Sequence, residues 1–411
     1  MSILIDRFRE EVSKSKDYRM KNEVERDVAY PTGFLGFDYM NGVVVHVKTD
    51  EMDFKYNSVG IVDGSIIMII GRSGCGKTTF TIQSCAEIIK PFKTGAIYHD
   101  NIEGGIIQSR IETLTGYNQK QLKEVYLARN SGVNSENVYE RVKMIHDIKI
   151  SDRANYEYDT GILDQDGNPI YKLEPTTYIL DSLAMLMPDK LTEEETMSGQ
   201  MSTTAAAKTN AQLFRRITPM LKAANIMFFV INHITEKVDI NMFAKKKSQL
   251  SFLKQDETLP GGKTPIYLAN LLIRLDDNAK LKETEGFGIA GSIVELTLLK
   301  SRSSAVGRSI NLIFDFDRGF DRELSMFQLL KEKGYVQGAG AYLYLAGYND
   351  IKFSQKNFKN KLYENVELQQ AFAKVSYEAL MELINKPVEE TDVVTDKFDL
   401  TKAVMGMQYA A

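Results

Sequence analysis

The sequence predicts an α/β fold with a largely parallel sheet. After residue 60, short apolar segments alternate with longer segments of helical character. Several apolar segments are continuous rather than alternating, which is typical of strands covered on both faces. Strands separated by helices favour parallel connections. The expected strands are 65–70, 95–98, 177–180, 226–232, 271–275, 294–299 and 310–315.

Size and composition restrict the class of protein. The chain has 411 residues, of which 43% are hydrophobic and 26% charged, as in ordinary globular proteins. The 51 Lys and Arg against 55 Asp and Glu exclude a uniformly basic nucleic-acid coat, although not a local basic loop. The 2 cysteines are too few for a disulfide framework, and no membrane span or signal peptide is visible. We therefore expect a soluble, cytoplasmic protein.

Three parts follow from the pattern along the chain. A helix is predicted over residues 1–30, because the apolar residues Ile5, Phe8 and Val12 recur there at three- and four-residue steps. This arm, taken as 1–32, either packs on its own domain or docks on a neighbouring copy. Residues 33–320 form the expected core. A smaller C-terminal part, 321–411, ends in the stretch 387–399 with five acids and one lysine, which predicts a solvated tail.

An insertion at 153–175 interrupts the core. Asp166-Gly167-Asn168-Pro169 is a turn signal between two short strand-like pieces. The acidic run 164–168 invites comparison with a calcium loop. However, the glycine comes two places too early and the twelfth position is Pro175 rather than glutamate. The sequence therefore favours a plain hairpin.

A complete phosphate-binding loop follows the first expected strand and precedes a helix over 79–90. Its glycines allow successive backbone N–H groups to converge on phosphate oxygens. Lys77 would reach the β- and γ-phosphates, and the Thr78 hydroxyl would bind Mg²⁺. We expect ATP to contact Gly71, Arg72, Ser73, Gly74, Cys75, Gly76, Lys77, Thr78 and Thr79.

Polar residues at the ends of three other strands complete the predicted chemistry. Asp181 ends an apolar strand and is the expected second anchor for Mg²⁺, the alternative being a helix-capping aspartate. A water-polarising base is expected at Glu103, with Asp100 as its rival. Asn232 and His233 end another strand, where His233 either senses the γ-phosphate or merely satisfies backbone groups.

The loop after His233 predicts a DNA contact. Residues 235–260 lack a clear period, and a loop of this length inside a compact domain is usually functional or disordered. Lysines track a phosphate backbone and aromatic rings stack on bases, although a lysine run alone is usually a solvated face. The expected DNA-binding residues are Phe243, Lys245, Lys246, Lys247, Phe252, Gly261 and Gly262.

With these motifs in order, the chain resembles the RecA-like recombinases, and most closely the phage UvsX type. The resemblance covers roughly residues 30–340. It is carried by LTEEET (191–196), FRRITP (214–219) and INH (231–233), by LPGG (259–262), and by KSR (300–302) followed by residues 310–319.

The resemblance implies a DNA-dependent ATPase that polymerises on single-stranded DNA and promotes homologous pairing and strand exchange with duplex DNA, in recombination and repair. It implies ATP and Mg²⁺ as cofactors, nucleotide between neighbouring subunits of a helical filament, and two DNA loops near 189–205 and 235–260. Lys300 and Arg302 would reach the next subunit's γ-phosphate. The N-terminal arm would clasp that subunit, and single-strand-binding and mediator proteins would be partners.

Some features depart from the family pattern. The acid after the second strand is one residue further on than usual, which keeps Asp100 open as the base. Arg110 stands where an aromatic ring commonly stacks on adenine, although a guanidinium can stack too. The insertions at 43–59 and 153–175 have no counterpart.

Other functions remain open from the sequence. A hexameric replicative helicase shares nearly every motif, a small-molecule kinase would need an acceptor pocket and an Arg-rich lid, and a non-enzymatic paralogue would bind ATP as a scaffold.

Overall fold

The structure is a computed structural model, and it describes residues 7, 27–48, 52–163, 167–188, 199–236, 253–254 and 256–385. Of the helix predicted over residues 1–30, only position 7 and residues 27–30 lie within the described part. The acidic stretch 387–399 and the predicted DNA contacts Phe243, Lys245, Lys246, Lys247 and Phe252 also lie outside them. None of the helices in the described part of the chain is long and apolar enough to cross a membrane.

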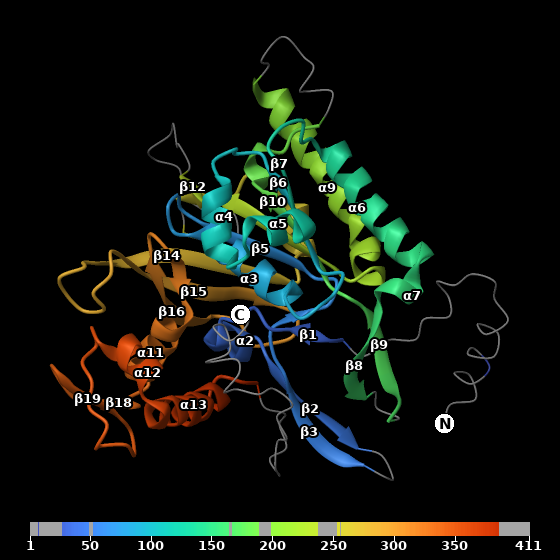
Figure 1. Cartoon of the computed structure of the whole chain (residues 1–411). Coiled ribbons are helices and arrows are strands. Elements are labelled where there is room, and N and C mark those ends of the chain that lie inside the picture. The colour runs from blue at the N-terminus through green and yellow to red at the C-terminus, as the bar shows by residue number, and fades with distance from the viewer. Residues whose placement is uncertain are drawn as a thin grey trace.

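A nine-stranded sheet forms the centre of the described structure, in the order β17-β16-β15-β14-β5-β11-β10-β6-β7 (Figure 1). The six strands from β14 to β7 are parallel, and β15, β16 and β17 continue the sheet in antiparallel fashion. The bounds are β5 Ile66–Gly71, β6 Ala96–Asn101, β7 Tyr126–Arg129, β10 Thr176–Asp181, β11 Ile226–His233, β14 Leu271–Leu281, β15 Gly291–Ser301, β16 Arg308–Asp315 and β17 Gly319–Asp321. The predicted α/β class, the mainly parallel sheet and all seven expected strands are confirmed.

Helices cover both faces of this sheet. Strand β5 is buried throughout, and its side chains alternate between two apolar clusters. Ile67 and Ile69 pack on the face that carries α3 (Lys77–Ile89), whereas Met68 packs on the face that carries α6 (Ser135–Ser151) and α9 (Gly199–Ala223). Figure 1 shows α6 and α9 lying side by side. Two shorter helices, α4 Gln108–Thr115 and α5 Gln119–Val125, follow β6.

The C-terminal segment packs on the first of these faces. It comprises α11 Arg322–Glu332, β18 Val336–Ala339, β19 Tyr342–Leu345, α12 Phe358–Glu364 and α13 Val366–Met381. Phe327, Phe358 and Phe372 are fully buried in the same apolar cluster as Ile69 of β5. Helix α2 (Leu35–Met40) contacts both α11 and α13. This segment therefore shares the hydrophobic core of the sheet.

Short pairs of strands lie outside the large sheet. The insertion at 43–59 is a hairpin of β2 (Val43–Lys48) and β3 (Asp53–Ser58), which extends away from the sheet in Figure 1. The insertion at 153–175 contains α7 (Arg153–Tyr156) and the predicted hairpin, β8 (Glu157–Leu163) with β9 (Pro169–Leu173).

The helix predicted over residues 1–30 is wrong at its end. Residues Ala29–Tyr30 form strand β1, which pairs with β4 (Ile61–Val62). Tyr30 is buried in the core of the sheet, so tertiary contacts override the local pattern there.

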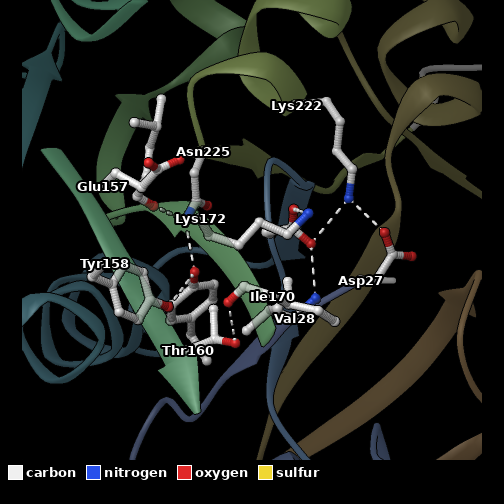
Figure 2. Close-up of polar contacts among 12 residues, drawn as sticks. Asp27, Val28, Glu157, Tyr158, Thr160, Ile170, Lys172, Lys222 and Asn225 are labelled. Carbon is white, nitrogen blue, oxygen red and sulfur yellow. Dashed lines mark hydrogen bonds and ion pairs between the residues drawn. The ribbon is translucent and has the colours of Figure 1, made fainter. Parts of the chain in front are cut away.

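The buried carboxylate of Asp63 joins the β8–β9 hairpin to the core. Figure 2 labels Lys172 of this hairpin together with Lys222 and Asp27. Asp63 accepts hydrogen bonds at Oδ1 from the Val28 backbone N–H and from Lys222 Nζ, both at 3.0 Å, and its Oδ2 lies 3.5 Å from Lys172 Nζ. Lys222 also donates to Asp27 at 2.5 Å. Because Lys172 belongs to β9, the same carboxylate contacts both the insertion and Val28, the residue before β1.

Candidate nucleotide site

The phosphate-binding loop leaves β5 at Gly71 and enters α3 at Lys77. Gly76, the N-cap of α3, has a φ of +85°, which favours glycine. A Cβ on Gly71 would lie 2.5 Å from the Leu275 carbonyl oxygen, so only glycine fits beside β14. These two glycines let the chain turn sharply between strand and helix, as a phosphate cradle requires.

Lys77 is folded over this loop. Its Nζ donates to the carbonyl oxygens of Gly71 at 3.1 Å and Arg72 at 2.8 Å. Burial lowers the pKa of the Lys77 amine, and the nearby carboxylates of Asp181 and Glu103 act in the opposite direction. The Lys77 ammonium thus contacts the backbone of the loop, and phosphate oxygens of a bound nucleotide would replace the carbonyl oxygens as its hydrogen-bond acceptors.

Thr78 and Asp181 meet at the carboxyl end of the sheet. Thr78 Oγ1 donates to Asp181 Oδ2 at 2.7 Å, while Asp181 Oδ1 is buried and has no hydrogen-bond partner among the described residues. Burial raises the pKa of Asp181 to about 6, and Glu103 adds to this rise. An orphaned carboxylate oxygen beside a hydroxyl fits Mg²⁺, which takes one or two protein oxygens and completes its shell with water and phosphate. No group of three or more metal-ligating side chains occurs in the described part of the chain.

Glu103 and Asp100, which the sequence left as rivals, lie in different environments. Glu103 Oε1 is 2.7 Å from His233 Nε2, and Glu103 and Lys77 interact electrostatically. Burial favours a raised pKa for Glu103, but the Ser182 hydroxyl, His233 and Lys77 lower it overall. Glu103 therefore carries its negative charge beside the phosphate loop, in contact with His233, which was also predicted for this site.

Asp100 is occupied elsewhere. It is buried, and its carboxylate accepts hydrogen bonds from Arg141 of α6 and from the Tyr178 hydroxyl of β10. Tyr178 belongs to the apolar cluster on the α6 and α9 face, whereas α3 covers the opposite face. A carboxylate paired in this way is poorly placed to accept a proton from water near the phosphates.

Asn232 connects this site to the predicted second DNA loop. Its Oδ1 accepts from the His233 backbone N–H, and its Nδ2 donates to the Pro260 carbonyl at 2.9 Å. The next residues, Gly261 and Gly262, have φ values of +90° and +88° and lead into α10 (Lys263–Leu268). A Cβ on Gly261 would lie 2.7 Å from Leu183, so close packing alone requires glycine at this position.

Arg110 faces the turn between β16 and β17. Its guanidinium donates to the Asp317 carbonyl, and Phe316 beside it is 45% exposed. Phe320, after the same turn, packs 2.8 Å from where a Gly76 Cβ would lie. Phe320 thus packs against the start of α3, and Arg110 contacts the turn that precedes Phe320.

Lys300 and Arg302 lie at the other end of the sheet. Ser301 is the register partner of Leu271, and Leu271 is the partner of Ile67, four residues before Gly71 in β5. Lys300 Nζ donates to the carbonyl oxygens of Ile266 and Tyr267 at 3.1 and 2.7 Å, and Arg302 is exposed. The structure does not bring this pair together with the phosphate loop of its own chain.

Two contacts near the site were not predicted. Arg274 Nη1 and Nη2 bind Glu257 at 2.7 and 2.9 Å, and Arg72 Nη2 lies 3.1 Å from Glu236. An arginine within an otherwise apolar expected strand, 271–275, was the available signal for the first contact. No local signal indicated the partner, because the glutamate of each pair is distant in sequence.

Comparison with known proteins gives one consistent result. No family profile matches the chain. The chain is 25% identical over 348 residues to Protein RecA of Bordetella petrii, covering 84% of this chain and 80% of the relative. It is 24% identical over 352 residues to Protein RecA of Acinetobacter baylyi (86% and 87% covered) and 23% over 347 residues to that of Rickettsia bellii (84% and 87% covered). Low identity over most of both chains supports a RecA-like family.

Proposed function

We propose that this chain is an ATP-dependent DNA recombinase of the phage UvsX type. It polymerises on single-stranded DNA as a helical filament and promotes homologous pairing and strand exchange. In this proposal residues 1–32 are the oligomerisation arm, 33–320 the ATPase core and 321–411 the C-terminal part. If the protein is phage-encoded, it acts in the host cytoplasm.

The observation that carries the proposal is the position of the basic strand end. Lys300 and Arg302 stand at the opposite end of the sheet from the phosphate loop of the same chain. A head-to-tail assembly can place this end against the nucleotide of a neighbouring copy. The pair would then neutralise charge on the transferred phosphoryl group, so that ATP turnover would require assembly.

The chain's own residues would divide the remaining chemistry. Lys77 would bind the β- and γ-phosphates, and Thr78 with Asp181 would hold Mg²⁺, which supplies charge neutralisation at the phosphates. Glu103 would orient and deprotonate the attacking water. His233, in contact with Glu103, would respond to the γ-phosphate, and the Asn232–Pro260 hydrogen bond would carry that response toward the DNA loop.

A ring-shaped replicative helicase is the second candidate, because the same strand-end cations can serve a closed ring. The decisive experiment measures phosphate release with and without single-stranded DNA, alongside negative-stain images of the same mixtures. We expect DNA-stimulated release and extended filaments. Closed six-membered rings would refute the filament, and release unaffected by DNA would revive a small-molecule kinase.

A further inference from the structure

A two-stranded ribbon beside the nucleotide site brings two carboxylates to opposite positions. Strand β12 (Thr235–Glu236) pairs with β13 (Glu257–Thr258), and Glu236 is the register partner of Glu257. Side chains of register partners leave the same face of an antiparallel pair, where like charges destabilise the pairing. Each glutamate therefore needs a counter-charge for the ribbon to persist.

The two counter-charges differ in how firmly they are held. Arg274, from the sheet strand next to β5, binds Glu257 through two hydrogen bonds, and the side chains of both are at least 92% buried. Arg72, from the phosphate loop, contacts Glu236 through one nitrogen at 3.1 Å, with side-chain exposures of 59% and 67%. A buried two-bond pair is difficult to separate, whereas an exposed single contact exchanges readily.

We propose that Arg72 is an exchangeable counter-charge through which bound nucleotide loosens the β12–β13 ribbon. Arg72 is the second residue of the phosphate loop, and a triphosphate offers its guanidinium more negative charge than one carboxylate does. When Arg72 turns to the phosphates, Glu236 remains opposite Glu257 without its partner. This inference rests on the proposed binding of ATP, and it adds a positioning role for Arg72 and Glu236.

The reverse coupling follows from linkage. If nucleotide draws Arg72 away from Glu236, then Glu236 must weaken nucleotide binding by the same factor. Because the ion pair is exposed, the factor is about two- to fivefold.

Amide hydrogen exchange of the full-length protein tests this inference, read on peptides covering residues 230–236 and 256–262. A non-hydrolysable ATP analogue with Mg²⁺ should speed exchange in the ribbon about two- to fivefold in the wild type. Arg72→Gln without nucleotide should exchange as fast as the nucleotide-bound wild type. Glu236→Gln should show no response to nucleotide and should bind the analogue about two- to fivefold more tightly.

A matched control is available on α6. Lys143 and Asp147 form a similarly exposed pair at 2.9 Å, with side-chain exposures of 51% and 52%. Asp147→Asn should change neither ribbon exchange nor analogue affinity. Two results would overturn this inference but not the proposed function. One is hydrogen exchange in the wild-type ribbon that does not change at saturating analogue. The other is a nucleotide-free Arg72→Gln variant whose ribbon exchanges at the rate of the nucleotide-free wild type. A wild-type protein that fails to bind the analogue would overturn the proposed function as well.

Discussion

Substitution of Arg302 by alanine tests whether catalysis is shared between subunits. The register places Ser301 beside Leu271 and Leu271 beside Ile67, four residues from Gly71. Arg302 follows Ser301 and donates its backbone N–H to the Asn270 carbonyl, one position further from Gly71. Five residues along a strand and two strand spacings across the sheet put Arg302 about 19 Å from the start of its own phosphate loop. This is more than an extended arginine side chain spans, so any contact with the nucleotide must come from a neighbouring copy.

The expected result is a large loss of turnover with little loss of binding. Removing a cation that stabilises the transferred phosphoryl group lowers turnover by about 10³-fold or more. Arg302→Ala should therefore bind ATP nearly as well as the wild type and lose its DNA-stimulated phosphate release. ATP binding is retained because the substitution leaves the phosphate-loop residues Lys77 and Thr78 unchanged.

Mixing two inactive variants makes the test specific for sharing between subunits. Glu103→Gln should bind ATP without hydrolysing it, yet still offer Arg302 to its neighbour. In an equal mixture with Arg302→Ala, about one quarter of the interfaces combine an intact Glu103 with an intact Arg302. Phosphate release should recover to about a quarter of the wild-type rate on DNA.

A control mixture of Arg302→Ala with the Glu103→Gln/Arg302→Ala double variant should stay inactive, because no interface in it contains Arg302. An Arg302→Ala protein that hydrolyses ATP at the wild-type rate would refute the reasoning. So would a first mixture no more active than its components.

Three further predictions concern single residues. Lys77→Ala should abolish ATP binding in a fluorescent-nucleotide titration, whereas the exposed Lys90→Ala should bind normally; equal affinities would contradict the role of Lys77. Asp63→Asn should lower the free energy of unfolding by about 3 kcal/mol in urea, because it leaves Lys172 and Lys222 without a buried counter-charge. Asp27→Asn, at an exposed site, should cost less than about 1 kcal/mol, and equal losses would contradict this account. Burial lowers the pKa of Lys149 from 10.5 to about 7, so the unfolded chain holds more protons above pH 7 and stability should rise from about pH 7 to 9. Lys149→Met should reduce that slope, and an unchanged slope would argue against a neutral Lys149.

The strands were predictable where burial on both faces leaves a continuous apolar run. Strand β5 is buried at every position, and the sequence shows it as such. Strand β7 was missed because it is a four-residue edge strand with three exposed positions. At an edge, pairing with one neighbour is enough to form a strand, and no hydrophobic pattern is required.

The sequence by itself determined the components of the nucleotide site. The phosphate loop with Lys77 and Thr78 is recognised from consecutive residues. Strand-end acids such as Asp181 are recognised because they directly follow apolar runs in the sequence. These features are local, because backbone turns and strand burial depend on adjacent residues.

Only the tertiary structure decided how those components are distributed. Asp100 and Glu103 are three residues apart, yet one is paired with Arg141 and Tyr178 while the other contacts His233. Likewise, the register of β14 and β15 sends Arg302 away from its own phosphate loop. Strand pairing and side-chain contacts join residues that are far apart in the sequence, 41 and 78 positions for the two partners of Asp100 and 130 for Glu103 and His233. The balance of burial and charge at such contacts exists only once the chain has folded.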